Sequence, residues 1–159
     1  MKKLILLFAF CLSATLCETA IAQVTLRVNI ATQPIWGPVG YDHVEYYYLP
    51  DIDAYYYVPQ HRYIYLEGRR WKSSSALPER YRNYDMYNSR KVVINENKPY
   101  LRDQAYRTKY AVTTERSGQQ SIRDSHDSKY FVNKNHPEHS KWQDNQKKQG
   151  NRKQDNSHR

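Results

Sequence analysis

The chain has 159 residues and a formal net charge of +9, which suits one small domain with additional segments. Its two cysteines, Cys11 and Cys17, both lie within the first 20 residues. The remainder therefore offers no thiol for nucleophilic catalysis, metal binding or disulfide formation.

Residues 1–22 are predicted to be a signal peptide. Lys2 and Lys3 precede a mostly apolar run that is too short for a membrane span, and small residues lead up to the Ala22–Gln23 bond. Bulky residues precede both cysteines, which speaks against a lipoprotein. We expect cleavage between Ala22 and Gln23 and export to the periplasm or the medium. The mature chain would have no transmembrane segment and a net charge of about +8.

Residues 23–40 are predicted to be an N-terminal strand or connector. The alternation of apolar residues from Val24 to Ile30 fits either a strand added to the edge of a sheet or a tether. Two prolines and two glycines then indicate turns between residues 33 and 40. We expect Trp36 to cover one end of the core; the alternative is a platform for a ligand.

Residues 41–112 are predicted to form a tyrosine-rich domain that is mainly β, an α+β fold built on a small antiparallel meander. Nine of the 16 tyrosines lie between Tyr41 and Trp71, in short runs separated by Pro, Asp and Gly. This pattern is typical of strands joined by tight turns. The expected strands are His43–Leu49, Ile52–Val58, Arg62–Glu67 and Arg69–Ser74.

The second half of this domain is predicted to add one strand and one helix. Residues 90–95 form the strand, and tyrosines at three-residue spacing in residues 79–88 indicate a short helix or a helical turn. Pro99 stands where helices begin, and residues 100–112 lack Gly and Pro. We therefore expect a C-terminal helix of about three turns over 100–112.

The order of these aromatic and proline motifs, from Tyr46 to Tyr110, resembles a group of small exported bacterial proteins of uncharacterised function. The resemblance implies a tyrosine-rich β-meander and no known activity. In that group, a Pro-Tyr-x-x-His helix often carries histidine. Here Asp103 occupies the histidine position after Pro99 and Tyr100, which speaks against a metal role.

Residues 113–159 are predicted to be a disordered, polar and basic tail. Ser, Gln, Asn, Asp, Lys and His dominate this segment, and large apolar side chains are few, chiefly Tyr130 to Val132 and Trp142. Such a segment buries too little apolar surface to offset the entropy lost on ordering.

Motifs for catalysis or metal binding are missing from the sequence. It contains no HxH, HExxH, GxSxG, P-loop or EF-hand pattern. His136 and His139 form the one close histidine pair and are expected to belong to a solvated polar tract. Asp51 and Asp53 are expected to shape a turn. We therefore expect no catalytic residue, cofactor or metal; an unrecognised hydrolase is the remaining enzymatic alternative.

The sequence predicts an exported binding or structural module of the cell envelope. Tyrosines occupy both alternation phases of the first two strands, whereas a single core needs only one phase inside, so one face is expected to contact a partner. That partner would be an envelope protein or polysaccharide, since export disfavours nucleic acid. The alternative is a binder of polyanions, acidic polysaccharide or nucleic acid, through the basic and aromatic middle and the tail. The candidate contact residues are Tyr47, Tyr55, Tyr57, Trp71, Arg69, Arg70 and Lys72.

Overall fold

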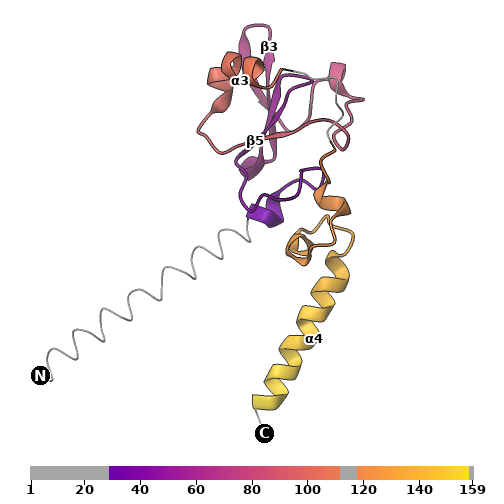
Figure 1. Cartoon of the computed structure of the whole chain (residues 1–159). Helices are drawn as coiled ribbons and strands as arrows, with labels where there is room; N and C mark the ends of the chain where they lie inside the picture. Colours follow the sequence, from indigo (N-terminus) through magenta and orange to yellow (C-terminus); the bar gives the residue numbers. More distant parts are fainter. Residues whose placement is uncertain (1–28, 112–117, 158–159) are drawn as a thin grey trace, which may run out of the picture.

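A five-stranded antiparallel sheet lies at the centre of the structure, a computed structural model that describes residues 29–111 and 118–157 (Figure 1). The strand order is β4-β3-β2-β1-β5, so the first four strands form the predicted meander and β5 pairs with β1. The predicted mainly β, α+β fold is thereby confirmed. The strands are β1 (Tyr46–Leu49), β2 (Ala54–Tyr57), β3 (Arg62–Glu67), β4 (Arg70–Ser74) and β5 (Val92–Ile94).

Four of the five strands are shorter than predicted. Just before β1, the backbone is hydrogen-bonded by side chains and not by a neighbouring strand. Asn29 binds the backbone of Val44 on both sides, accepting from its N–H (2.9 Å) and donating to its carbonyl (3.2 Å). The next N–H, of Glu45, donates to Asn95 Oδ1 (2.8 Å). Because these backbone groups are satisfied outside a ladder, regular pairing begins only at Tyr46.

Strand pairing places tyrosines side by side on both faces of the sheet. On one face, here called the first face, Tyr46 lies opposite Tyr57 and Tyr48 opposite Tyr55, with ring centroids 4.7 and 4.9 Å apart. On the second face, Tyr47 of β1 lies opposite Tyr56 of β2. Directly opposed aromatic pairs stabilise antiparallel strands.

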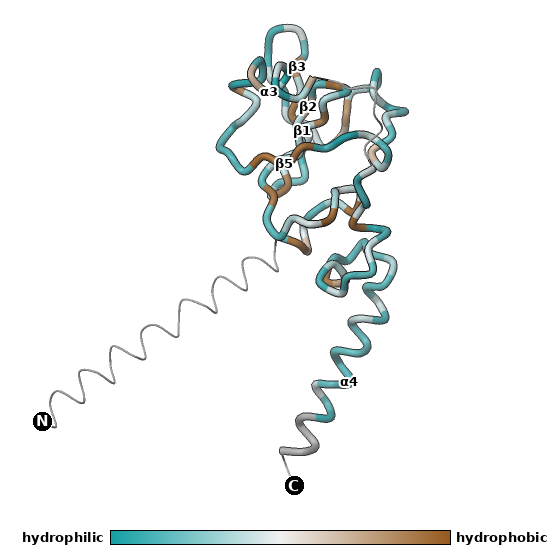
Figure 2. Tube along the Cα trace, in the orientation of Figure 1, coloured by the Kyte–Doolittle hydropathy of each residue, from teal (hydrophilic) through white to brown (hydrophobic). Residues whose placement is uncertain are grey.

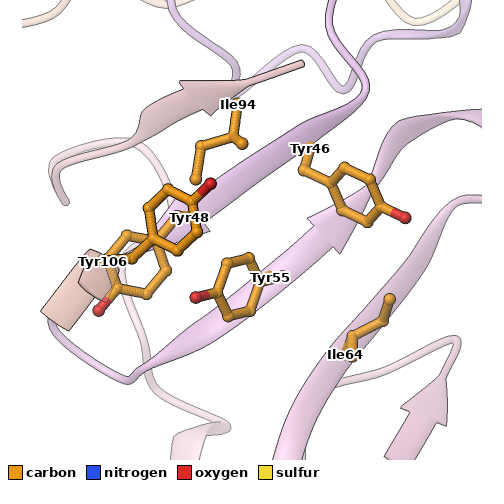
Figure 3. Packing of buried hydrophobic residues seen from close by; sticks show 6 residues of the cluster. All are labelled: Tyr46, Tyr48, Tyr55, Ile64, Ile94 and Tyr106. Carbon is orange, nitrogen blue, oxygen red and sulfur yellow. The ribbon is translucent and has the colours of Figure 1, made fainter. Parts of the chain in front are cut away.

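The first face is covered by the short 3-10 helix η3 (Pro99–Arg102) and by α3 (Asp103–Lys109). Tyr106 packs on Tyr48 and Tyr55, and the six buried side chains of this layer are drawn in Figure 3. The helix predicted over 100–112 therefore begins at Pro99 as expected, but it is α-helical only as far as Lys109. Residue 112 lies outside the described residues.

Two other segments cover the second face. Trp36 packs against Tyr47 at one end, as predicted. The chain between β4 and β5 covers the other end, where Leu77 and Met86 join a cluster around Leu49. Within residues 79–88 only η2 (Glu79–Tyr81) is helical. Both faces are therefore core, and the expectation that one face is an open contact surface is wrong.

The C-terminal segment packs against residues 29–40. It contains the 3-10 helices η4 (Ile122–Asp124) and η5 (Ser128–Val132), and its backbone bonds that of the connector: Ile122 N–H donates to Gly37 O, and Arg123 N–H to Ile35 O, both at 2.8 Å. Ile122 and Tyr130 are buried together with Ile30. The predicted disorder is thus wrong for residues 118–138, and also for residues 139–157, which form a helix.

The reason is that this segment completes a core that other residues begin. Ile30 and Val39 already supply apolar surface, so two buried side chains from the tail are enough to close the cluster. Polar contacts add to them: Tyr130 Oη accepts from Gly40 N–H at 2.7 Å, and Asn133 Nδ2 donates to the Gln33 carbonyl at 2.6 Å. The composition of the segment alone does not reveal these contacts, because the partners lie elsewhere in the chain.

The long helix α4 (His139–Ser157) extends from this C-terminal segment (Figure 1). Figure 2 shows it in hydrophilic colours along its coloured length, and of its described side chains only Trp142 is large and apolar. None of the helices that the structure describes combines the length and the apolar character needed to cross a bilayer.

Several predictions concern residues 1–28, which the structure does not describe. The signal peptide 1–22, the Ala22–Gln23 cleavage site and most of the strand expected between Val24 and Ile30 lie there. The described end of that strand, residues 29–30, is helical instead.

Candidate functional site

The predicted contact residues do not form one exposed surface. Tyr47 and Tyr55 are both fully buried, on opposite faces of the sheet, so their assignment to a contact surface is corrected to core. Tyr57 and Trp71 are partly buried against other rings of the first face. The physical reason is that a different segment covers each face of the sheet, so the side chains on both faces are buried.

The predicted basic residues are exposed at and beyond the β3–β4 turn but are not gathered into one cationic site. Arg69, Arg70 and Lys72 are all solvent-exposed, and Lys72 forms a salt bridge with Glu67. Lys91, from the same basic stretch of the sequence, is buried. The salt bridge of Lys72 and the burial of Lys91 therefore reduce the number of free, exposed positive charges in the middle of the chain.

A polar network fixes α3 to the first face. Tyr48 Oη donates to Asp53 (2.8 Å), and Tyr55 Oη donates to Asp103 (2.9 Å). Arg107 forms salt bridges with both carboxylates, with its Nη1 2.6 Å from Asp53 Oδ2. Burial raises the pKa of the two phenols, and their hydrogen bonds to carboxylates raise it further. The hydroxyls therefore stay protonated and hold the helix on the sheet.

A second network joins the connector to the second face. Tyr47 Oη donates to Gln33 Oε1 (3.0 Å), and Gln33 Nε2 donates to Asn29 Oδ1 (3.0 Å). Burial raises the pKa of Tyr47 as well. A Cβ on Gly37 would lie only 2.7 Å from Tyr47 Oη, so this close approach requires glycine.

A groove of about 800 Å³ opens beside this second network. It is lined by residues 31–36, by Tyr56 and His61, and by residues 132–135; we call it the junction groove. The connector and the C-terminal segment, which form most of it, lie side by side below the sheet in Figure 1. Its volume is within the range of small-molecule binding sites.

One wall of the junction groove is aromatic. Trp36 is partly exposed and meets Tyr56 edge-on, with ring centroids 5.0 Å apart. The same indole packs on Tyr47, 5.3 Å between centroids, and is therefore held from behind by the core. An aromatic side chain anchored in this way offers a rigid apolar surface to a ligand.

His61 lies at the mouth of the groove in a left-handed backbone conformation, with a φ of 52°. It caps the 3-10 helix η1 (Val58–Gln60), at a position where glycine is favoured. Its Nδ1 lies 3.1 Å from Tyr56 Oη. Burial raises the pKa of Tyr56 to about 12, so the phenol is protonated at neutral pH and can donate to Nδ1. In that arrangement the Nε2 of a neutral ring carries the proton and is the remaining donor of the ring.

The groove is suited to binding through apolar contact and donated hydrogen bonds. Its lining includes Lys134 and the amide of Asn135, both exposed, and contains no Asp, Glu, Ser or Cys.

Comparisons with known proteins identify no relative. The chain matches no protein-family model, and no curated protein or solved structure is significantly similar to it. The function is therefore inferred from the geometry of the junction groove.

The His136–His139 pair is part of the fold of the C-terminal segment. His136 is buried, its Nε2 lies 3.2 Å from the Ser125 carbonyl, and its Nδ1 accepts from Glu138 N–H. His139 Nδ1 lies 2.7 Å from the Phe131 carbonyl. Within the described ranges, no three His, Cys, Asp or Glu side chains gather in a way that could hold a metal.

The main components of the groove were not among the sequence-based candidates. The sequence favours a covering role for Trp36, and it places His61 between the predicted strands Ile52–Val58 and Arg62–Glu67. Residues 132–135 fall in the segment predicted to be disordered. Two signals were available: a histidine where a turn favours glycine, and Asn133 directly after an apolar triplet.

Lys91 gives a testable pH dependence. Its side chain is buried, its Nζ donates to the Tyr87 carbonyl (3.0 Å), and burial lowers its pKa to about 8. Between pH 8 and about 10 the unfolded chain, with a lysine pKa near 10.4, binds more protons than the folded one. Stability should therefore rise with pH across this window.

We expect Lys91→Met to stabilise the protein at pH 7 by about 1–2 kcal/mol, because it removes a buried charge that forms no salt bridge with a carboxylate among the described residues. The gain should shrink at pH 9.5. Urea unfolding at both pH values measures it, with the exposed Lys148→Met as the control. Equal destabilisation at the two pH values would contradict the assignment.

Proposed function

We propose that the protein is an exported, non-catalytic binding module of the cell envelope, with the junction groove as its ligand site. The observation that carries the proposal is the groove itself. Three segments that are separated in the sequence meet there around an anchored indole, and polar side chains are part of the lining. The predicted signal peptide 1–22 supports export.

The chemistry of the described side chains supports binding over catalysis. The carboxylates of Asp53 and Asp103 are engaged by Arg107 and by tyrosine hydroxyls, which leaves them poor general bases. In the groove, His61 has a phenol beside it, and the lining contains no serine, thiol or carboxylate. The hydroxyl of Thr32, which also lines the groove, donates to the Asn29 carbonyl at 3.0 Å.

An alternative candidate is a polyanion binder that uses the β3–β4 turn. Arg69 and Arg70 are exposed there next to the partly exposed Trp71, and the chain carries a net charge of +9. Mixed basic and aromatic surfaces of this kind suit acidic polymers.

The test is co-sedimentation of the mature chain, residues 23–159, with washed envelope fractions of the producing cell. Asn135→Trp fills the groove from its exposed rim and should weaken association by about tenfold or more. The matched control, Asn97→Trp, places the same ring on an exposed turn outside the groove and should leave association unchanged.

The double variant Arg69→Ala/Arg70→Ala separates the two candidates. Under the groove proposal it retains association. Loss of association in this variant, together with full binding by Asn135→Trp, would favour the polyanion binder. No association of the wild-type chain would contradict both.

A further inference from the structure

We infer that the junction groove takes a carboxylated glycan, with a sugar ring against Trp36 and the carboxylate held by Lys134 and His61. This inference rests on the proposed function and specifies the ligand class of the same site.

The first argument is charge. Within residues 118–138, which form one side of the groove, the two other cations are paired with carboxylates. Lys129 pairs with Asp42 (2.8 Å), and Arg123 pairs with Asp124 (2.9 Å). Lys134 is exposed and has no salt bridge within the part of the chain that the structure describes. A cation left unpaired beside a groove without acidic residues favours an anionic ligand.

The second argument is the placement of His61. A left-handed residue at the end of η1 is most easily glycine, yet this position has a histidine whose ring lines the groove. With Tyr56 Oη on Nδ1, the free Nε2 offers an N–H to an acceptor. His61 and Lys134 belong to segments about 70 residues apart, and only the fold brings both to this opening.

The third argument is the aromatic wall. Trp36 and Tyr56 contribute apolar surface to a groove that is otherwise lined in part by polar side chains. This combination suits a ligand that has both an apolar ring face and a charged substituent. A nucleic acid carries a charge on every nucleotide and is held by many cations. The lining has one lysine and one histidine, which matches an isolated carboxylate better.

The experiment compares two trisaccharides on the mature chain, 23–159, by calorimetric titration at pH 7. One carries a single glucuronic acid residue between two neutral sugars, and the other is its carboxyl-reduced, neutral counterpart. We expect the acidic trimer to bind at least about tenfold more tightly, because a charge-assisted contact is lost in the neutral one.

Two fold-compatible variants test the residues. His61→Gly removes the ring at a backbone conformation that glycine adopts freely, and Lys134→Gln removes an exposed charge. Each should lower affinity for the acidic trimer by about fivefold or more and leave the neutral trimer nearly unaffected. The control, Lys148→Gln, removes the same charge from exposed α4 and should change neither. Thermal melts of all variants confirm that folding is retained.

Equal binding of the two trimers, or an equal loss in Lys148→Gln, would overturn the inference, the latter by showing general attraction to the net charge. Tighter binding of a single-stranded hexanucleotide would also overturn it. The two levels fail separately: groove-dependent envelope association without discrimination between the trimers removes only the ligand class. Envelope association that ignores Asn135→Trp removes the proposed function.

Discussion

Serine in place of Tyr55 is expected to destabilise the protein by about 3–5 kcal/mol, the cost of replacing a large buried ring by a small side chain. Tyr55 is fully buried, and its ring contacts those of Tyr48, Trp71 and Tyr106. The substitution also leaves Asp103 without its phenolic donor. Small domains are stable by only about 5–15 kcal/mol, so this loss is a large part of the total stability. Urea unfolding followed by circular dichroism measures the change.

Tyr57→Ser is the matched control on the same strand and the same face. Tyr57 is partly exposed, so its loss should cost about 1 kcal/mol. Tyr55→Phe separates the ring from the hydroxyl and should cost about 1–2 kcal/mol. Tyr47→Ser applies the same test to the second face, with an effect as large as that at Tyr55. If Tyr55→Ser and Tyr57→Ser were equally mild, the first face could not be core.

Truncation after Thr114 is expected to lower the stability by about 2–4 kcal/mol and the melting temperature by roughly 10 °C or more. The deletion removes Ile122 and Tyr130, exposes Ile30, and leaves the backbone of residues 35–40 without its partners. It also removes one side of the junction groove, so envelope association should be lost. A scanning calorimeter gives the first result and co-sedimentation the second.

Truncation after Gln146 is the control. It deletes most of α4 and keeps η4, η5 and Trp142, the one large apolar side chain in the described part of that helix. Exposed polar residues contribute little, so the stability should change by about 0.5 kcal/mol or less. If truncation after Thr114 were just as mild, the C-terminal segment would not stabilise the connector.

The candidate site could be predicted only in part. The sequence predicts that Trp36 covers one end of the core, within a connector that two prolines and two glycines make rich in turns. Its role as a groove wall depends on residues 132–135, which approach through a bond between Asn133 and Gln33, 100 positions apart. No local pattern reports a contact at that separation.

The positions of the first three strands follow from the amino-acid sequence alone. Tyrosine runs broken by Pro, Asp and Gly indicate where β1 to β3 lie, because side-chain alternation and turn formation depend on neighbours a few residues away. The segments that cover these strands are known only from the folded chain: α3 on the first face, and Trp36 with the β4–β5 connection on the second. The folded chain also shows that the C-terminal segment packs, since Tyr130 and Asn133 find their partners on the connector. Whether a side chain is buried depends on which distant segments pack over it. The local sequence pattern shows only that the surface of a strand is apolar.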